Sequence, residues 1–447
     1  MASADMPGNV SVTCFAAYGQ SETLWLGGSI SYIKPWLPDL EHVVFAKSSF
    51  AVYLAMFWSC ICSTILLLPL SSIAVPTGGA DAYTSNAEAA FQTLQKWYND
   101  TSGIYGTTGW WNSANGLTTL GDLAVVSPLS KPQVTKVLAN SLVAAAETNQ
   151  QLQATKAITS DFNILSVYRT IAPSELDAKV SADPKGFLND YYDDEGWWAL
   201  AWIQAYDITQ NKDYLQAAID IFADMKNGST TPCGGIWWDK PQTYVNAIAN
   251  ELYLSVASHL ANRSNKSFYL PIAQEQFSWF QESGMINSQN LINDGLTADC
   301  KNNNGTIWSY NQGVILGALV ELNLAAPNHV YLTTASSIAV AAISSLSVNG
   351  ILHDPCGTDC GADGSQFKGI FMRNLRKLQQ AAPDPRFLAF VKTNARTIWV
   401  KDRNVTSTEL GLLWEGPFLG PANASLQSSA LDGLVAAAAF EGRGIAS

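Results

Sequence analysis

Apolar residues recur at helical spacing along most of the chain, in stretches of two alternating kinds. One kind is a plain amphipathic stretch, such as "AEAAFQTLQKWY" at residues 87–98. The other kind opens with a loop rich in glycine and aromatic residues and continues as an apolar helix, such as "TTGWWNSANGLTTLGDLAVV" at residues 107–126. Further plain stretches lie at 131–147, 213–226, 268–282, 331–346 and 385–400, and further loop-bearing stretches lie at 191–209, 234–261, 305–323, 364–380 and 412–440.

This alternation predicts an all-α fold. About six loop-bearing helices alternating with about six plain ones is the arrangement of an (α/α)6 toroid, in which one set forms an inner ring and the other an outer ring. We expect the loop-bearing helices in the inner ring, so that their loops meet at one end. A concave face lined by aromatic rings and a few acids is a typical binding site. Any single ring could instead pack in the core, but several such loops at one end favour a cleft.

An uncharged apolar run at residues 50–75 precedes this body and is long enough to cross a bilayer as a helix. Lys47 stands before the run and a small-residue motif at residues 80–82 follows it, an arrangement that resembles a secretory signal with a long leader. The run is either cleaved or kept as a signal anchor; a buried helix is disfavoured because the run is not amphipathic. We therefore divide the chain into an unassigned leader (1–49), a signal peptide or signal anchor (50–80) and the toroidal domain (81–447).

The cysteines beyond the apolar run are even in number, which in an exported chain indicates two disulfides. They are Cys233, Cys300, Cys356 and Cys360, whereas Cys14, Cys60 and Cys62 lie in or before the run. Three pairings are possible, and we favour Cys356 with Cys360 and Cys233 with Cys300. A zinc site is the competing interpretation, but no CxxC pair occurs and the nearby histidine is His353 alone, so we expect no metal.

N-glycosylation acceptor patterns are spread over the body and agree with a secreted glycoprotein. They lie at Asn99, Asn227, Asn262, Asn265, Asn304, Asn404 and Asn423. The formal net charge of −12 argues against a nucleic-acid partner, because such binding depends on Lys and Arg contacts to phosphate. The 15 Trp and 16 Tyr residues suit a packed core, and they also suit stacking against the apolar faces of sugars.

The stretch "YYDDEGWW" at residues 191–198 places three carboxylates between aromatic rings. Acids in a first helical turn are often only caps. Capping does not explain their place beside the rings, where burial raises a carboxyl pKa and two neighbouring carboxylates push their pKa values apart. One protonated and one ionised acid is what cleavage of a glycosidic bond needs, and Asp193 and Asp194 could lie about 5 Å apart, the separation of retaining enzymes. Glu195 is better explained as a cap or supporting group.

The stretches "YYDDEGWWALAWIQAYDITQNKDYL", "CGGIWWDKPQTYVNAIANELYL", "YNQGVILGALVEL" and "FKGIFMRNL" resemble glycoside hydrolase family 76, the endo-α-1,6-mannanases, in its fungal branch. The resemblance runs from about Ala87 to Phe440. It implies an (α/α)6 catalytic domain and retaining hydrolysis of α-1,6-mannan or of mannoprotein glycans, without a cofactor or a metal. It also implies that Asp193 is the nucleophile and Asp194 the acid/base. We expect a monomer.

Secondary site residues follow less directly from the sequence. Trp197, Trp198, Trp237 and Trp238 are candidate walls of sugar subsites, and Asp239, Asn246, Tyr310 and Asn311 are candidate hydrogen-bond partners of mannose hydroxyls. Each of these residues has an alternative role in the core or in a helix cap. Asp354, Asp359 and Asp363 do not follow the ligand spacing of a calcium loop and are expected in a polar, disulfide-pinched loop.

The chain ends in "FEGRGIAS", without the hydrophobic tail that directs a lipid anchor in some fungal members of the family. A secreted or wall-associated enzyme is therefore expected, which favours hydrolysis. A transglycosylase or mannosidase that acts on cell-wall mannoprotein glycans and a non-catalytic mannan-binding toroid stay open. An isoprenoid cyclase-like toroid with Mg²⁺ on the aspartates is disfavoured by the export signal and by the lack of basic residues near the pair. Chain length, branching, the acceptor and the true start are not determined by the sequence.

Overall fold

The computed structural model describes residues 79, 81–149, 152–158, 164–170 and 186–442. The expected leader and signal segment at 1–80 lies outside the described residues, apart from Gly79. Cys14, Cys60 and Cys62 also lie outside them. The described residues belong to one unit that spans Val75–Ser447. No helix in this part of the chain is both long and apolar enough to span a membrane.

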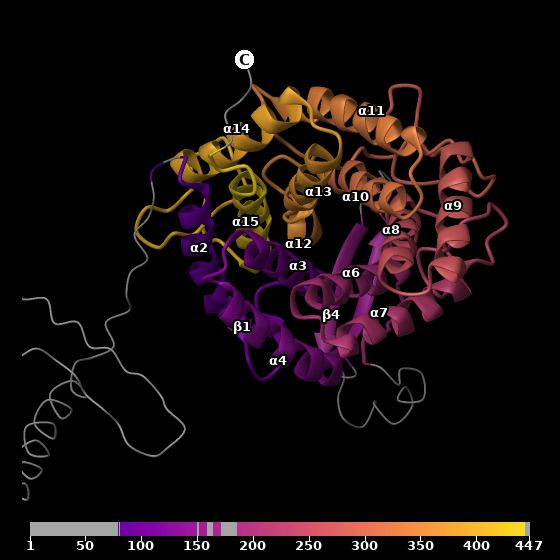
Figure 1. Cartoon of the computed structure of the whole chain (residues 1–447), viewed down its shortest axis with the longest axis horizontal. Coiled ribbons are helices and arrows are strands. Elements are labelled where there is room, and N and C mark those ends of the chain that lie inside the picture. The colour runs from indigo at the N-terminus through magenta and orange to yellow at the C-terminus, as the bar shows by residue number, and fades with distance from the viewer. Residues whose placement is uncertain (1–78, 80, 150–151, 159–163, 171–185, 443–447) are drawn as a thin grey trace, which may run out of the picture. The chain divides into compact units, whose positions relative to one another are not determined.

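In the described part of the chain, six helices form a closed inner ring (Figure 1). They are α3 (Trp110–Val126), α6 (Tyr192–Thr209), α8 (Ala247–Arg263), α10 (Ser309–Ala325), α13 (Phe367–Ala381) and α15 (Ala424–Ala438). Each packs against the next in this order, and α15 packs against α3 to close the ring. All of them are loop-bearing helices of the sequence analysis, so the expected inner ring is present.

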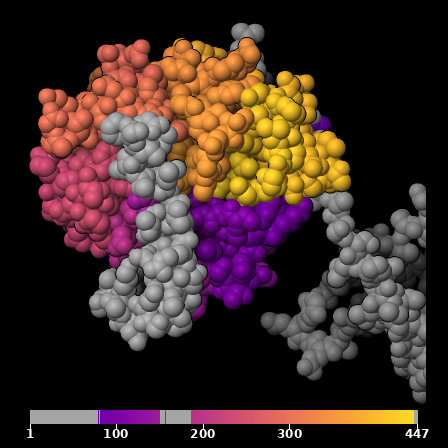
Figure 2. Space-filling model, turned by 180° about the vertical axis from the view of Figure 1, so that it is seen from behind, coloured from indigo at the N-terminus to yellow at the C-terminus, as the bar shows by residue number. Residues whose placement is uncertain are grey.

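The plain helices lie outside this ring. They are α2 (Tyr83–Leu94), α4 (Lys131–Asn149), α7 (Lys212–Met225), α9 (Lys266–Glu282), α11 (His329–Ser345) and α14 (Pro385–Lys401). Each contacts the inner helix that precedes or follows it in the chain, and α2 packs on α15. Figure 2, seen from behind, shows the indigo N-terminal helices directly against the yellow C-terminal ones. This contact between the two ends of the described chain completes the toroid.

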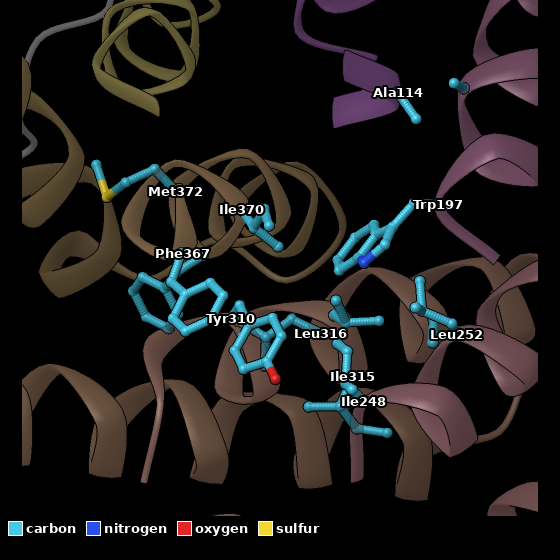
Figure 3. Close-up of a cluster of buried hydrophobic side chains, with 14 of the residues drawn as sticks. Ala114, Trp197, Ile248, Leu252, Tyr310, Ile315, Leu316, Phe367, Ile370 and Met372 are labelled. Carbon is cyan, nitrogen blue, oxygen red and sulfur yellow. The ribbon is translucent and has the colours of Figure 1, made fainter. Parts of the chain in front are cut away.

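The inner helices are buried on nearly all sides, and their sequences reflect this. In α8 every residue from Ala247 to Ala261 is buried. Glycines let neighbouring inner helices approach closely: a Cβ added at Gly313 of α10 would lie 2.6 Å from the Cα of Phe371 of α13. The core between these helices is filled by Trp197, Ile248, Leu252, Ile315, Leu316 and Ile370, among others (Figure 3). Because neighbouring inner helices pack this closely, the N-terminal ends of these helices are held in fixed positions.

Short elements complete the described chain. The 3-10 turns are η2 (Gln95–Trp97) and η3 (Lys226–Gly228), α12 (Gly361–Gly364) is a single turn, and the short strands are β1 (Tyr98–Asn99), β2 (Ile104–Tyr105), β5 (Ser347–Val348) and β6 (Ile351–Leu352). A longer antiparallel hairpin joins β3 (Leu152–Ile158) to β4 (Ile164–Thr170), with Lys156 opposite Ser166. The sequence analysis did not predict this hairpin. Its strand β4 lies against α12.

Two disulfides staple loops that precede inner helices. Cys233 is joined to Cys300, across 67 positions of sequence, and Cys356 is joined to Cys360. This is the pairing that the sequence favoured. The first bridge ties the loop before α8 to the loop before α10, and the second pinches the loop before α13. Both therefore lie at the end of the ring where the loop motifs meet.

Candidate active site

Asp193 and Asp194 lie in the first turn of α6, at the mouth of the ring. The helix begins after Tyr191, whose backbone is extended, and Tyr192 N donates a hydrogen bond of 2.9 Å to the carbonyl of Trp238. Lys240 N donates in turn to the carbonyl of Asp190 at 2.9 Å. The start of α6 is thus pinned to the loop before α8, and the free N–H groups of its first turn favour negative charge there.

An ammonium group joins the two carboxylates. Lys156 Nζ, which comes from β3, lies 3.0 Å from Oδ1 and from Oδ2 of Asp193 and 2.6 Å from Oδ1 of Asp194. Two oxygens that both lie this close to one nitrogen are less than about 6 Å apart, which fits the spacing of retaining glycosidases and is too short for inverting ones. The sequence analysis missed Lys156, which stands in no recognisable motif.

The environments of the two aspartates differ. Complete burial raises the pKa of Asp194 to about 6; Lys156 lowers it, and the charge of Asp193 adds to the rise. Asp194 Oδ2 also accepts a hydrogen bond of 2.7 Å from Asn189 Nδ2. Asp193 keeps some contact with solvent, at 6% exposure, whereas Asp194 has none. Asp194 is therefore the carboxyl of the pair that is suited to hold a proton near neutral pH.

Glu195 turns away from the pair and serves the local structure. Its Oε1 accepts a hydrogen bond from Asn189 N at 3.2 Å and lies 2.8 Å from Lys240 Nζ, which also pairs with Asp224. This matches the supporting role that the sequence suggested. The two lysines also correct an argument of the sequence analysis: basic residues do lie beside the acids, because Lys156 and Lys240 approach from segments remote in sequence.

The four candidate tryptophans fall into different environments. Trp197 stacks on Trp111 with ring centroids 5.6 Å apart and faces the centre of the ring. Trp238 lies beside Tyr191, at 5.1 Å between centroids, and next to Lys156. Trp237 is partly exposed and donates from Nε1 to Thr230 Oγ1.

Trp198 corrects the expectation that it forms a subsite wall. The ring is fully buried and packs against Trp110, Phe187 and Trp202, with centroids 4.4, 5.2 and 5.5 Å away. Successive helical residues point about 100° apart. Trp197 therefore faces the ring interior while Trp198 points into the core between α6 and its neighbours.

A run of aromatic rings continues from Trp197 across the floor of the mouth. Trp111 stacks on Phe367 at 6.2 Å, and Phe367 stacks on Tyr310 at 3.8 Å with an interplanar angle of 8°. Figure 3 shows Trp197, Tyr310 and Phe367 projecting from three inner helices toward one region. Asp363 of α12 accepts a hydrogen bond of 2.7 Å from Trp111 Nε1 and so fixes that ring. The "GWW" and "FKGIF" loop motifs were the sequence signal for Trp111 and Phe367.

The polar candidates mostly support the backbone. Asp239 accepts from Thr243 N at 2.8 Å and from Thr243 Oγ1 at 2.7 Å, and Asn246 caps α8 by accepting from Ala249 N at 3.2 Å. For Asp239 and Asn246 the capping alternative is therefore the one that the structure supports. Asn311 is fully buried, and neither polar atom of its side chain has a hydrogen-bond partner among the residues that the structure describes.

Two buried acids near the pair were not predicted. Asp294 accepts a hydrogen bond of 2.7 Å from Tyr244 Oη, and burial, aided by the charge of Asp193, raises its pKa to about 7. Glu251 of α8 is fully buried, neither of its carboxyl oxygens is hydrogen-bonded within the described part of the chain, and burial raises its pKa well above its usual value. Both acids stand alone in the sequence, so no motif marks them.

In the loop before α13, Asp354 stabilises the start of a neighbouring inner helix. Asp354 accepts from Ser309 N at 2.8 Å and from Ser309 Oγ at 2.7 Å, which caps α10. Within the described residues, no group of three or more His, Cys, Asp or Glu side chains is arranged to hold a metal ion. The chemistry at the mouth is that of paired carboxyl groups beside aromatic rings.

Comparison with known proteins finds related sequences and structures. The family model described as glycosyl hydrolase family 76 matches residues 174–445. Mannan endo-1,6-alpha-mannosidase DFG5 of Saccharomyces cerevisiae is 26% identical over 215 residues, which are 43% of this chain and 47% of that protein. Mannan endo-1,6-alpha-mannosidase DCW1 of Candida albicans is 25% identical over 206 residues, 41% of this chain and 46% of that protein. The matched part spans about half the length of these curated relatives.

Solved structures share the fold. One is an inactive variant of the α-1,6-mannanase GH76A of Salegentibacter sp. HEL1_6, with two consecutive aspartates changed to asparagine and α-1,6-mannotriose bound. It has a TM-score of 0.64 at 20% identity and covers 80% of this chain and 100% of that chain. Dfg5 from Chaetomium thermophilum in complex with glucosamine has a TM-score of 0.65 at 17% identity, over 81% of this chain and 92% of that one.

Proposed function

The chain belongs to glycosyl hydrolase family 76, and on that basis we propose that it is an endo-α-1,6-mannanase that hydrolyses α-1,6-linked mannan with retention of anomeric configuration. The observation that carries this proposal is the aspartate pair at the mouth of the ring, whose oxygens share one ammonium and so lie less than about 6 Å apart, closer than the spacing of inverting enzymes. The names of the fungal relatives and the mannotriose bound by the bacterial neighbour support α-1,6-mannan as the substrate class.

Asp193 is the nucleophile of this mechanism. Its carboxylate attacks the anomeric carbon and forms a covalent glycosyl-enzyme ester while the glycosidic bond breaks. Asp194 gives its proton to the departing oxygen, and then takes a proton from the water that attacks the ester and frees Asp193. The raised pKa of Asp194 supports this division, because the acid must carry a proton when the substrate binds. The inactive double-aspartate variant of the bacterial neighbour supports an adjacent pair as the reactive groups.

Aromatic rings at the mouth supply the sugar-binding surface of the proposed enzyme. Trp238 and Tyr191 flank the aspartates, and Trp197, Trp237 and Tyr310 are further candidates for stacking on mannose rings. The substrate is a mannan backbone or a mannoprotein glycan. Two disulfides support an exported protein, since such bonds persist in oxidising compartments.

The test is turnover of α-1,6-mannotetraose by the full chain, with products and anomers followed by NMR. We expect shorter products that are first released as α-anomers. Asp193→Asn and Asp194→Asn should each lower turnover by about 10³-fold or more, because each removes a group that acts in the transition state. Products longer than the substrate would change the assignment to transglycosylation, since the glycosyl-enzyme ester then reacts with a sugar. Unchanged turnover in both variants would refute the proposed roles.

A further inference from the structure

The ammonium group of Lys156 contacts the carboxylate oxygens that the reacting sugar must reach. A carbon about to be attacked lies about 3–3.5 Å from the nucleophile, and the departing oxygen lies about 2.6–3.2 Å from the acid. Lys156 Nζ lies 3.0 Å from both oxygens of Asp193 and 2.6 Å from Oδ1 of Asp194. The ammonium and the scissile bond would thus both need contact with the same carboxylate oxygens, so the lysine competes with substrate for them.

The ammonium is held on its other sides by aromatic rings. Nζ lies 4.7 Å from the centroid of the Tyr191 ring and 5.7 Å from that of Trp238, which are cation–π distances. The backbone N of Lys156 donates a hydrogen bond of 2.9 Å to Tyr191 Oη. The side chain is 1% exposed. Two carboxylates and two rings around the buried ammonium make this a formed cation pocket rather than a surface ion pair, and the backbone contact holds the strand in place.

The charges around this pocket come from separate elements. Asp193 and Asp194 belong to α6, and Asp363 of α12 adds a further negative charge that favours the ammonium. Lys156 is carried by a hairpin outside the helical ring, and β4 of that hairpin lies against α12. Asp193 and Asp194 are thus held by an inner helix, whereas their counter-ion Lys156 belongs to a hairpin that is not part of the ring.

We propose that Asp193, Asp194, Tyr191 and Trp238 form a pocket for a primary ammonium group, and that Lys156 is its built-in ligand, which closes the active site until the β3–β4 hairpin withdraws. The pocket accepts small protonated amines whenever Lys156 is absent. The closing effect rests on the proposed glycosidase function, whereas the ammonium pocket does not. A lysine that assisted catalysis would need to leave the reacting oxygens of the two carboxylates free for substrate. Lys156 instead contacts oxygens of both carboxylates and so competes with substrate.

The first experiment measures kcat/KM on α-1,6-mannotetraose for the wild type, Lys156→Met and Lys156→Arg. Methionine is unbranched like lysine but one heavy atom shorter and uncharged, so kcat/KM should rise at least tenfold, while the arginine variant should stay as slow as the wild type. Lys212→Met, on an exposed lysine at the start of α7, is the control and should change nothing. Unchanged or lower activity of Lys156→Met would show that the lysine does not close the site.

The second experiment tests the pocket without catalysis. Isothermal titration with propylammonium chloride should show binding of one equivalent to Lys156→Ala, none to the wild type and none to the double variant Lys156→Ala/Asp193→Asn. Propan-1-ol, which has the same length and no charge, should not bind. Absence of propylammonium binding to a folded Lys156→Ala variant would overturn the pocket. Propylammonium binding without mannan turnover in any variant would keep the pocket and refute the proposed enzyme instead.

Discussion

The mouth and the far end of the helical ring both contain charged residues that are largely removed from water, but they neutralise those charges in different ways. At the far end, Arg263 near the end of α8 reaches Asp207 of α6 at 2.7 Å and Glu321 of α10 at 2.8 Å. Each partner comes from a neighbouring inner helix, so the ion pairs join the elements that pack together. Burial lowers the pKa of His259 to about 4, so the positive charge beside Glu321 at neutral pH comes from Arg263, with Lys377 nearby.

At the mouth, adjacent acids of one helix turn are neutralised by lysines from outside the ring. Lys156 comes from the β3–β4 hairpin and Lys240 from the loop before α8. Neighbouring like charges on one helix are costly for the fold, and their counter-ions can leave without separating any two inner helices. At the far end, the carboxylates pair with a cation from a neighbouring inner helix. At the mouth, the carboxylates of the proposed active site pair with cations from outside the ring. The origin of the cation, and not burial alone, therefore distinguishes the two groups of carboxylates.

The largest effect is expected from the far end. Arg263→Ala should lower the free energy of unfolding by about 3 kcal/mol, because Glu321 is left partly buried without its counter-ion. Turnover per folded molecule should stay at the wild-type level. Urea denaturation measures the first quantity and active-site-normalised kinetics the second. Arg386→Ala, which removes an exposed pair with Asp384, is the matched control and should leave unfolding unchanged. A loss of specific activity in Arg263→Ala would contradict the expectation that the far-end ion pairs affect stability and not turnover.

The second effect is on the pH dependence of the mouth. Asp194 must be protonated when substrate binds, so kcat/KM should fall about tenfold per pH unit above its pKa of about 6. Lys156 lowers that pKa, and Lys156→Met should therefore move the falling limb to higher pH. Profiles of kcat/KM between pH 4 and pH 8 measure the limb. A limb that moves to lower pH in the variant would contradict the contact between the two groups.

A third, smaller effect separates adjacent tryptophans. Trp198→Phe should lower the free energy of unfolding by about 1–2 kcal/mol, because it leaves unfilled space against Trp110 and Trp202. Trp197→Phe should instead lower kcat/KM by about threefold through weaker sugar stacking. Thermal unfolding and kinetics on the same preparations compare them. The reverse pattern would return Trp198 to the list of subsite walls.

The smallest effect concerns the ring that Asp363 fixes. Asp363→Ala removes the hydrogen bond to Trp111 Nε1, worth about 1 kcal/mol, so KM should rise about fivefold at most. Asp359→Ala, an exposed position in the same disulfide-pinched loop, is the control and should behave as the wild type. An unchanged KM would mean that the position of Trp111 does not affect substrate binding.

Much of the helical frame could be predicted from the sequence. The loop motifs followed by long apolar stretches located the ring helices, and the helical spacing of apolar residues located the outer helices, because each outer helix buries one face. The position of the aspartates at the start of α6 and the bridge between Cys356 and Cys360 followed from local patterns, whereas Cys233 with Cys300 was favoured only as the remaining pair. The β3–β4 hairpin could not be found like this, because the segment has no helical period and its decisive contact, from Lys156 to Asp193, crosses 37 positions.

Local patterns also fail where two roles share one residue type. Asn262 fits a glycosylation pattern, yet its Nδ2 donates to the carbonyl and to Oε2 of Glu321 and belongs to the far-end network. Asp239 resembles a sugar ligand in sequence but supports the turn that contains Thr243. Which partner a polar group selects depends on what the fold brings within about 3 Å, and that is a property of packing.

The sequence by itself determined the all-helical frame, the alternation of inner and outer helices and the helix start that carries Asp193 and Asp194, because these depend on residues a few positions apart. The tertiary structure alone decided which of two adjacent tryptophans lines the interior of the ring, which charged groups pair between helices, and that Lys156 contacts both aspartates. Those outcomes depend on groups that are distant in sequence, and only the closed ring brings them into contact.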